Sequence, residues 1–133
     1  MIAPHATALY AALSALIFIW QTAQVVKGRR RVGAVMGDKG DKSLARAIRG
    51  HANASEQMPI FLIMLALGEM IGAPAIAVHL LGVAFVLGRL IHGLHFTDKL
   101  PDLKFRQLGM VLSLTSTGVL AIGLAAHALA GLL

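Results

Sequence analysis

The run ATALYAALSALIFIWQTAQVV, residues 6–26, contains no charged side chain and is long enough to cross a bilayer as a helix. Similar stretches follow it, and helices are expected at residues 6–26, 43–71, 75–96 and 107–133. The chain of 133 residues is 57% hydrophobic and 14% charged, with a mean hydropathy of +0.76. Soluble globular domains are less apolar than this. We therefore predict one domain, residues 1–133, folded as an all-α, integral membrane four-helix bundle.

The positions of the basic residues predict the orientation of the helices. Lys and Arg are absent before Lys27 and after Arg106, and they concentrate in the polar stretches 27–42 and 99–106. Loops rich in Lys and Arg remain in the cytoplasm, so both termini of this multi-pass membrane protein are expected outside it. The first basic residue follows the first apolar run, which indicates a retained helix rather than a cleaved signal peptide. Basic residues interleaved with aromatics are lacking, so we predict no nucleic-acid partner.

Turn and cap residues separate the expected helices. Glycines at 33, 37 and 40 interrupt the first polar stretch, and Ser43 is the expected N-cap of the second helix. The sequence Gly72-Ala73-Pro74 predicts a turn between the second and third helices.

The second helix is the least apolar of the four, and its polar residues share one face. At about 100° per residue, the side chains on that face belong to Arg46, Arg49, Asn53 and Glu56. A charged face cannot point at lipid, so it must meet the bundle interior, a neighbouring subunit or a water-filled cavity. One interpretation is a polar binding site. The other is that Arg49 and Glu56 neutralise each other.

The third helix carries Arg89 and His92 three residues apart, with Phe96 one turn further, and Arg106 begins the fourth helix. The guanidinium groups of Arg29 to Arg31, Arg49, Arg89 and Arg106 are expected to converge on one cytoplasmic rim, which would suit a small anionic ligand. The alternative is that Arg89 forms a salt bridge between helices. The residues leave both interpretations open.

The fourth helix has a small residue at every fourth position, a ridge formed by Gly109, Ser113, Thr117, Ala121 and Ala125. Such a ridge favours close helix packing over a polar channel lining. The histidines at 5, 79 and 127 lack the neighbouring ligands that a metal site needs, so no metal is predicted. The absence of cysteine excludes disulfides, zinc-thiolate sites and a cysteine nucleophile.

The second-helix pattern Arg46-x-x-Arg49-x-His51-x-Asn53-x-x-Glu56-x-x-Pro59 resembles the signature of the MAPEG proteins, the membrane-associated proteins of eicosanoid and glutathione metabolism. Arg89-x-x-His92 and Arg106 extend the resemblance over nearly the whole chain, which looks most like a bacterial branch similar to the microsomal glutathione transferases. The resemblance implies a homotrimer with glutathione bound between subunits near the cytoplasmic face, and small hydrophobic electrophiles as second substrates.

The resemblance also implies roles for individual residues. Arg49 would bind a carboxylate of glutathione, Asn53 its backbone, and Glu56 its N–H groups. The residues assigned to complete the glutathione site are His51 and one of Arg29 and Arg30 from the adjacent subunit, together with Arg89 and His92. Arg106 would stabilise the glutathione thiolate.

One position departs from the family pattern, because Phe96 stands about where many members have a tyrosine, and Tyr10 is the only tyrosine in the chain. Activation by arginine is therefore expected. The predicted function is that of a glutathione-dependent membrane transferase, or peroxidase. The alternative is a non-catalytic member that binds lipid or a partner protein. A transporter is a third class, but neither an inverted repeat nor a broken helix supports it.

Overall fold

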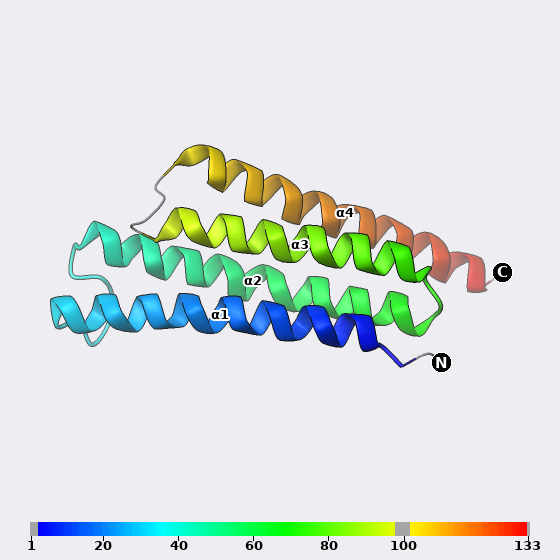
Figure 1. Cartoon of the computed structure of the whole chain (residues 1–133), viewed down its shortest axis with the longest axis horizontal. Helices are drawn as coiled ribbons and strands as arrows, with labels where there is room; N and C mark the ends of the chain where they lie inside the picture. Colours follow the sequence, from blue (N-terminus) through cyan, green and yellow to red (C-terminus); the bar gives the residue numbers. More distant parts are fainter. Residues whose placement is uncertain (1–2, 98–101, 133) are drawn as a thin grey trace.

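The computed structural model describes residues 3–97 and 102–132, which form a bundle of four helices without strands (Figure 1). These are α1 (His5–Val32), α2 (Lys42–Met70), α3 (Ala75–Phe96) and α4 (Leu103–Leu132). The end of α1 and the starts of α2 and α4 lie at one end of the bundle, which we call the basic end because Lys27, Arg29 to Arg31, Lys104 and Arg106 lie there. The start of α1 and the end of α4 lie at the opposite end, beside the turn from α2 to α3.

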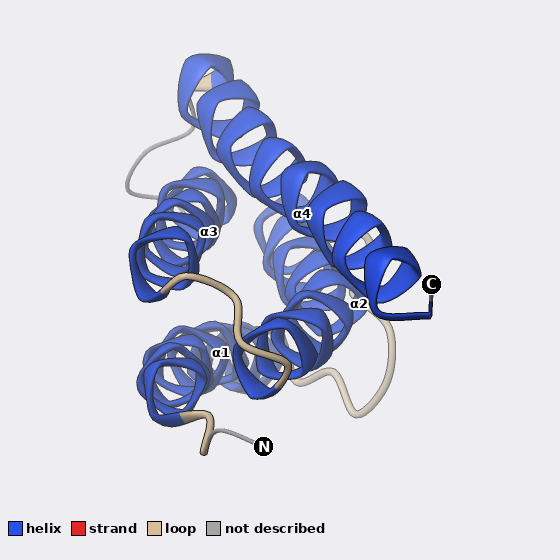
Figure 2. Ribbon diagram, turned by 90° about the vertical axis from the view of Figure 1, so that its right-hand side faces the viewer, coloured by secondary structure: helices blue, strands red, loops and turns tan. Residues whose placement is uncertain are grey.

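The helices α1, α2 and α3 pack around one another, whereas α4 packs on α3 and α2 and does not contact α1 (Figure 2). The view along the bundle shows α4 inclined to the other three helices. The centre is closed by the stacked rings of Phe61 and Phe85, whose centroids are 3.8 Å apart. Leu65 and Met58 of α2 are buried in the same cluster.

The distribution of side chains is that of a membrane protein. Large apolar side chains face outward, with Leu16 64% exposed and Ile122 74% exposed, whereas the polar side chains of Ser14, Gln21 and Ser113 are buried. An outer surface of this kind is suited to lipid rather than to water. Among the described residues, α1, α3 and α4 are long and apolar enough to span a membrane. The polar and charged residues in the first half of α2 exclude it from this set, but α2 runs alongside its neighbours in the bundle (Figure 1).

The helix α1 continues to Val32, six residues beyond the predicted end. Hydropathy detects only the apolar part of this helix, and its last turn consists of basic residues, which the helix dipole favours at a C-terminus. Gly33 ends the helix in the left-handed conformation (φ 64°), and its N–H donates to the carbonyl oxygen of Arg29. The N–H of Ala34 donates to the same oxygen at 2.9 Å.

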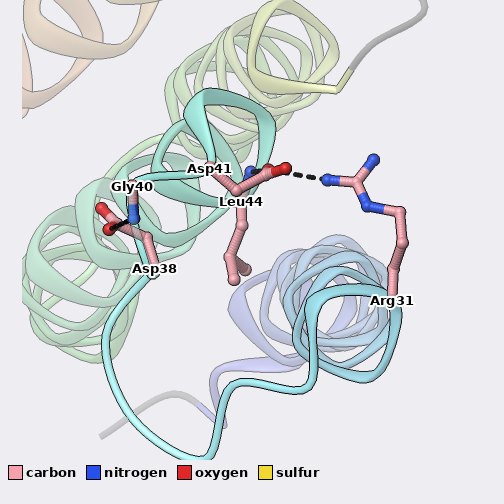
Figure 3. Close-up of polar contacts among 5 residues, drawn as sticks. All are labelled: Arg31, Asp38, Gly40, Asp41 and Leu44. Atoms are coloured by element: carbon pink, nitrogen blue, oxygen red, sulfur yellow. Dashed lines mark hydrogen bonds and ion pairs between the residues drawn. The ribbon is translucent and has the colours of Figure 1, made fainter.

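The predicted N-cap of α2 at Ser43 was wrong, because the helix begins at Lys42 and Asp41 caps it. The Asp41 carboxylate accepts the N–H of Leu44 at 2.7 Å and also forms an ion pair with Arg31 of α1 at 2.7 Å (Figure 3). An ionised carboxylate satisfies the free N–H groups of a helix start better than a hydroxyl does. One side chain therefore caps α2 and ties it to the end of α1.

The other boundaries differ less. The last helical residue of α2 is Met70, one before the predicted end, and α3 occupies the predicted range. The helix α4 begins at Leu103, four residues before the predicted start, since the Asp102 carboxylate accepts the N–H of Lys104 at 2.8 Å and supports an earlier first turn.

Close contact between α3 and α4 depends on glycine. A Cβ atom added to Gly109 would lie 2.7 Å from the carbonyl oxygen of Gly88, so any larger residue would force the two backbones apart. The predicted small-residue ridge packs only over its first half, because Gly109 and Ser113 are buried whereas Ala121 and Ala125 are exposed.

At the opposite end of the bundle, Glu69 near the end of α2 caps the start of α1. Its carboxylate accepts the N–H of Ala6 at 2.9 Å, the N–H of Thr7 at 2.8 Å and the Thr7 hydroxyl at 2.7 Å. This carboxylate satisfies N–H groups that a helix start leaves without partners, and it thereby joins two helices.

Candidate functional site

The polar face of α2 points away from its own bundle. Arg49 and Glu56 are exposed and Asn53 is half-buried, while the opposite face of the helix packs inward through Ala54 and Met58. The exposed stripe continues toward the other end of the bundle with apolar side chains at Ile60, Ile63 and Leu67. The charged groups thus lie on a surface that the single chain leaves uncovered.

The charges on this face do not neutralise each other. Arg49 and Glu56 form no ion pair, and the one ion pair in the described part of the chain joins Arg31 to Asp41. The interpretation in which Arg49 and Glu56 pair across two turns is therefore wrong. Arg46 behaves differently, because its guanidinium donates to the carbonyl oxygen of His95 at 2.5 Å and links α2 to α3.

Arg89 lies behind this face, buried between α2, α3 and α4. Its Nε donates to the hydroxyl of Ser113 at 3.0 Å, and its Nη1 donates to the carbonyl oxygen of Asn53 at 3.4 Å. Ser113 in turn donates to the carbonyl oxygen of Gly109 at 2.7 Å. The third guanidinium nitrogen, Nη2, has no partner although it is buried. No carboxylate among the described residues pairs with Arg89, so the predicted interhelical salt bridge is replaced by hydrogen bonds to neutral groups.

His92 lies one turn beyond Arg89 and is also buried, and its Nε2 has no partner in the described structure. Phe96 follows on the same face, with its ring centroid 5.0 Å from that of His92. The guanidinium carbon of Arg106, at the start of α4, lies 5.9 Å from the Phe96 ring centroid. The predicted inward face of α3 is confirmed, and Arg106 lies exposed at its basic end.

The remaining predicted residues lie on the other side of α2. His51 is two positions from Arg49, about 200° around the helix, and its ring lies 4.5 Å from that of Phe18 on α1. Arg29 donates to the carbonyl oxygen of Val35 at 2.7 Å, and Arg30 is exposed.

The arginines expected to converge on one rim therefore do not converge in a single chain. Arg89 is buried and contacts the backbone of Asn53, one turn from the outward-facing Arg49, whereas Arg29 and Arg30 lie on α1, on the other side of α2. The rotation of each helix decides which of its faces meets a neighbour.

Comparison with known proteins agrees with this architecture. The model of the MAPEG family matches residues 7–126. The chain belongs to the MAPEG family. It is also 38% identical over 104 residues to the inner membrane protein YecN of Escherichia coli strain K12, and that match covers 78% of each chain. The same protein of Escherichia coli O6:H1 strain CFT073 matches equally well.

Within the MAPEG fold, the structure adds a residue to the predicted site. Ser113 holds the buried guanidinium of Arg89 in place, and the sequence drew attention to it only as one of a ridge of small residues. The feature that could have identified Ser113 from the sequence is its hydroxyl group, because it stands at the ridge position of α4 that faces the buried cation of Arg89. The structure also explains the packing at Phe96, whose ring fills the space left by Gly50, where an added Cβ would lie 2.6 Å from Phe96 Cβ.

Proposed function

We propose that this MAPEG protein is a glutathione-dependent membrane transferase that acts on small hydrophobic electrophiles. The observation that supports this most is the set of side chains without partners on and behind α2. Arg49, Asn53 and Glu56 make no side-chain hydrogen bond or ion pair within the described residues, and Arg89 keeps one unpaired nitrogen directly behind Asn53. Charged groups at membrane depth are costly unless something compensates them, so a ligand or second subunit is expected there.

Glutathione has the groups that these side chains would bind. The Arg49 guanidinium suits one of its carboxylates, the Glu56 carboxylate can accept from its ammonium or amide N–H groups, and the Asn53 amide can both donate and accept. Arg89 and His92 would complete the pocket from behind through their unpaired nitrogens.

A complete site would need more than one copy of the chain. His51, Arg29 and Arg30 lie on the far side of α2 from Arg49, so a ligand that contacts both groups must lie between two subunits. The exposed apolar stripe of α2, at Ile60 and Leu67, would then be covered by the same neighbour. We therefore propose a homotrimer in a bacterial inner membrane, with three glutathione sites near the cytoplasmic face and both termini outside the cytoplasm.

Arg106 would stabilise the thiolate of glutathione. A cysteine-type thiol has a pKa of about 8.5, and lowering it by about two units needs about 2.7 kcal/mol. A guanidinium about 4 Å away contributes about 4 kcal/mol at an effective dielectric constant of about 20, so one arginine is sufficient. The thiolate sulfur would form a bond to the electrophilic carbon as the leaving group departs. With a peroxide it would attack one oxygen and break the O–O bond, which releases an alcohol and leaves a sulfenic acid that a second glutathione converts to the disulfide and water.

A non-catalytic role is the alternative, and one observation favours it. Phe96 provides no hydroxyl, and the guanidinium of Arg106 lies over the Phe96 ring. In that case the polar face of α2 would serve subunit assembly, and the protein would bind a lipid or a partner protein.

The test is a titration of purified protein in detergent with glutathione, monitored through the ultraviolet absorbance of the thiolate. Wild type and Lys104→Gln, an exposed charge change away from α2, should bind, whereas Arg49→Ala and Glu56→Ala should not. Both should also express less well, because each substitution would leave the groups that face it across the proposed subunit interface without a partner. A stable Glu56→Ala protein that binds normally would contradict the assignment. Binding without conjugation of a generic apolar electrophile would favour the non-catalytic alternative.

A further inference from the structure

A cavity opens at the basic end between α1, α2 and α3, on the other side of α2 from Arg49 and Glu56. Its volume is about 200 Å³, and its lining includes Gln24, Lys27, Arg31, Ser43, Leu44 and Phe96. A narrow space of about 10 Å³, enough for a single hydroxyl group, continues inward between the same helices. It shares Gln24 and Phe96 with the larger space and reaches Gln21 and the side of His51. We call the two spaces together the basic cleft.

One face of α1 supplies most of the polar lining. Gln21, Gln24, Lys27 and Arg31 recur at intervals of three and four residues, which places them along a single face of the helix. Lys27 and Arg31 are one turn apart at the mouth. Arg31 is paired with Asp41, as Figure 3 shows, while Lys27 has no ion pair in the described structure. Two cations and one carboxylate leave the mouth with one net positive charge.

The inner part of the cleft contains an unpaired buried amide. Gln21 is 5% exposed, and its Oε1 has no hydrogen-bond partner. An unpartnered buried polar group costs about 1–3 kcal/mol, so a ligand that bonds to it would gain affinity. Gly93 lies against the Gln21 amide and leaves no room for a larger residue there.

We propose that the basic cleft binds a small soluble polyol phosphate. The phosphate would lie at the mouth against Lys27 and Arg31, and a hydroxyl group would reach the amide of Gln21. The unpaired atom of Gln21 is an acceptor, so the ligand must donate to it. A hydroxyl donates without carrying a charge into the enclosed inner space, whereas an ammonium group would have to bury its charge there. Gln21 and Lys27 are six residues apart, which is about 9 Å along the helix. The lysine side chain is flexible and can bend toward Gln21, so the distance between its ammonium group and the Gln21 amide can match the length of a short polyol chain.

The shape of the cleft favours a soluble ester over a membrane lipid. In a phospholipid the acyl chains extend from the phosphate toward the membrane interior. In the cleft that direction is closed by Gly93 and the Phe96 ring, and about 200 Å³ cannot hold two acyl chains.

The experiment measures binding of glycerol 3-phosphate to the full chain in phosphatidylcholine nanodiscs. Trp20 is the only tryptophan and lies beside Gly93, so its fluorescence reports on the cleft, and calorimetry gives the stoichiometry. Wild type should bind one molecule per chain. Lys27→Gln should weaken binding about tenfold through loss of a charge-assisted hydrogen bond, and Gln21→Leu should weaken it about three- to tenfold. Lys104→Gln, which removes an equal charge outside the cleft, should not change it.

Several outcomes would overturn the proposal. No binding at millimolar ligand, or equal affinities of Lys27→Gln and Lys104→Gln, would exclude the cleft. Equal affinity for inorganic phosphate would show that the hydroxyl contact is absent. Loss of glycerol 3-phosphate binding when phosphatidylglycerol is added to the nanodiscs would identify a lipid headgroup as the occupant. Because the cleft does not include Arg49, Arg49→Ala should bind glycerol 3-phosphate normally even though glutathione binding is lost.

Discussion

The substitution Arg89→Met tests why a cation is buried in the bundle without a counter-ion. Methionine keeps the length and flexibility of the arginine stem but removes the charge and both interhelical hydrogen bonds, to Ser113 at 3.0 Å and to the Asn53 carbonyl at 3.4 Å. If Arg89 serves the fold, this change should destabilise it. If Arg89 is kept for a ligand, the fold should tolerate the change.

The two contributions to stability nearly cancel. A hydrogen bond from a charged donor contributes about 1.5–3 kcal/mol, and the contact of 3.4 Å is at the weak end, so the pair together contributes about 3 kcal/mol. Placing an arginine at the centre of a membrane helix costs about 2.5–3.5 kcal/mol on insertion scales. The net change in the free energy of unfolding should be within about 1 kcal/mol, which corresponds to a Tm shift of a few degrees or less for a chain of this size.

The matched control is Ser113→Ala, which keeps the buried charge and removes its best partner. That leaves the Arg89 Nε unsatisfied and should cost about 1–3 kcal/mol, so Ser113→Ala should be less stable than Arg89→Met. Thermal unfolding in one detergent, followed by circular dichroism, gives the ranking. Glutathione titration of the same samples should show at least a tenfold weaker affinity for Arg89→Met. This substitution removes both a cation that faces the ligand and the hydrogen bond that holds the Asn53 backbone.

The reverse ranking, with Arg89→Met melting well below Ser113→Ala, would show that the arginine is a structural tie between helices. Unchanged glutathione affinity in a folded Arg89→Met protein would remove Arg89 from the proposed site.

Further substitutions test other parts of the account. Arg106→Ala should keep glutathione affinity but reduce conjugation at neutral pH by roughly one to three orders of magnitude, with partial recovery at higher pH, whereas coinciding pH profiles would exclude Arg106 as the activating group. Gly109→Ala should destabilise the protein by about 1–3 kcal/mol because its Cβ would meet the α3 backbone, and an unchanged Tm would contradict that packing. Glu69→Gln should lower Tm by a few degrees, since a neutral amide caps the α1 start less well, with no effect on glutathione binding. A reporter fused after Leu133 should lie outside the cytoplasm and one inserted in residues 32–41 inside it, and the opposite labelling would reverse the orientation.

The helices could be predicted from the sequence because their signals are local. An uncharged run of sufficient length, a glycine after the last turn and a proline before the next one each act within a few residues, and they placed α3 and the turn before it within the predicted range. The predictions failed where hydropathy was used alone. The end of α1 and the start of α4 are polar, and their stability depends on the helix dipole and on a capping carboxylate rather than on apolar character.

The sequence also grouped Arg49, Asn53 and Glu56, since helical periodicity fixes which side chains share a face of one helix. It could not predict whether that face is covered, because this depends on the rotation of α2 against three other helices. Only the tertiary structure showed that Arg49 faces outward while His51 packs on Phe18, that Arg89 pairs with a serine 24 residues away, and that three helices enclose the basic cleft. These arrangements arise from contacts between distant segments, and a pattern within one helix contains no information on how its neighbours are oriented.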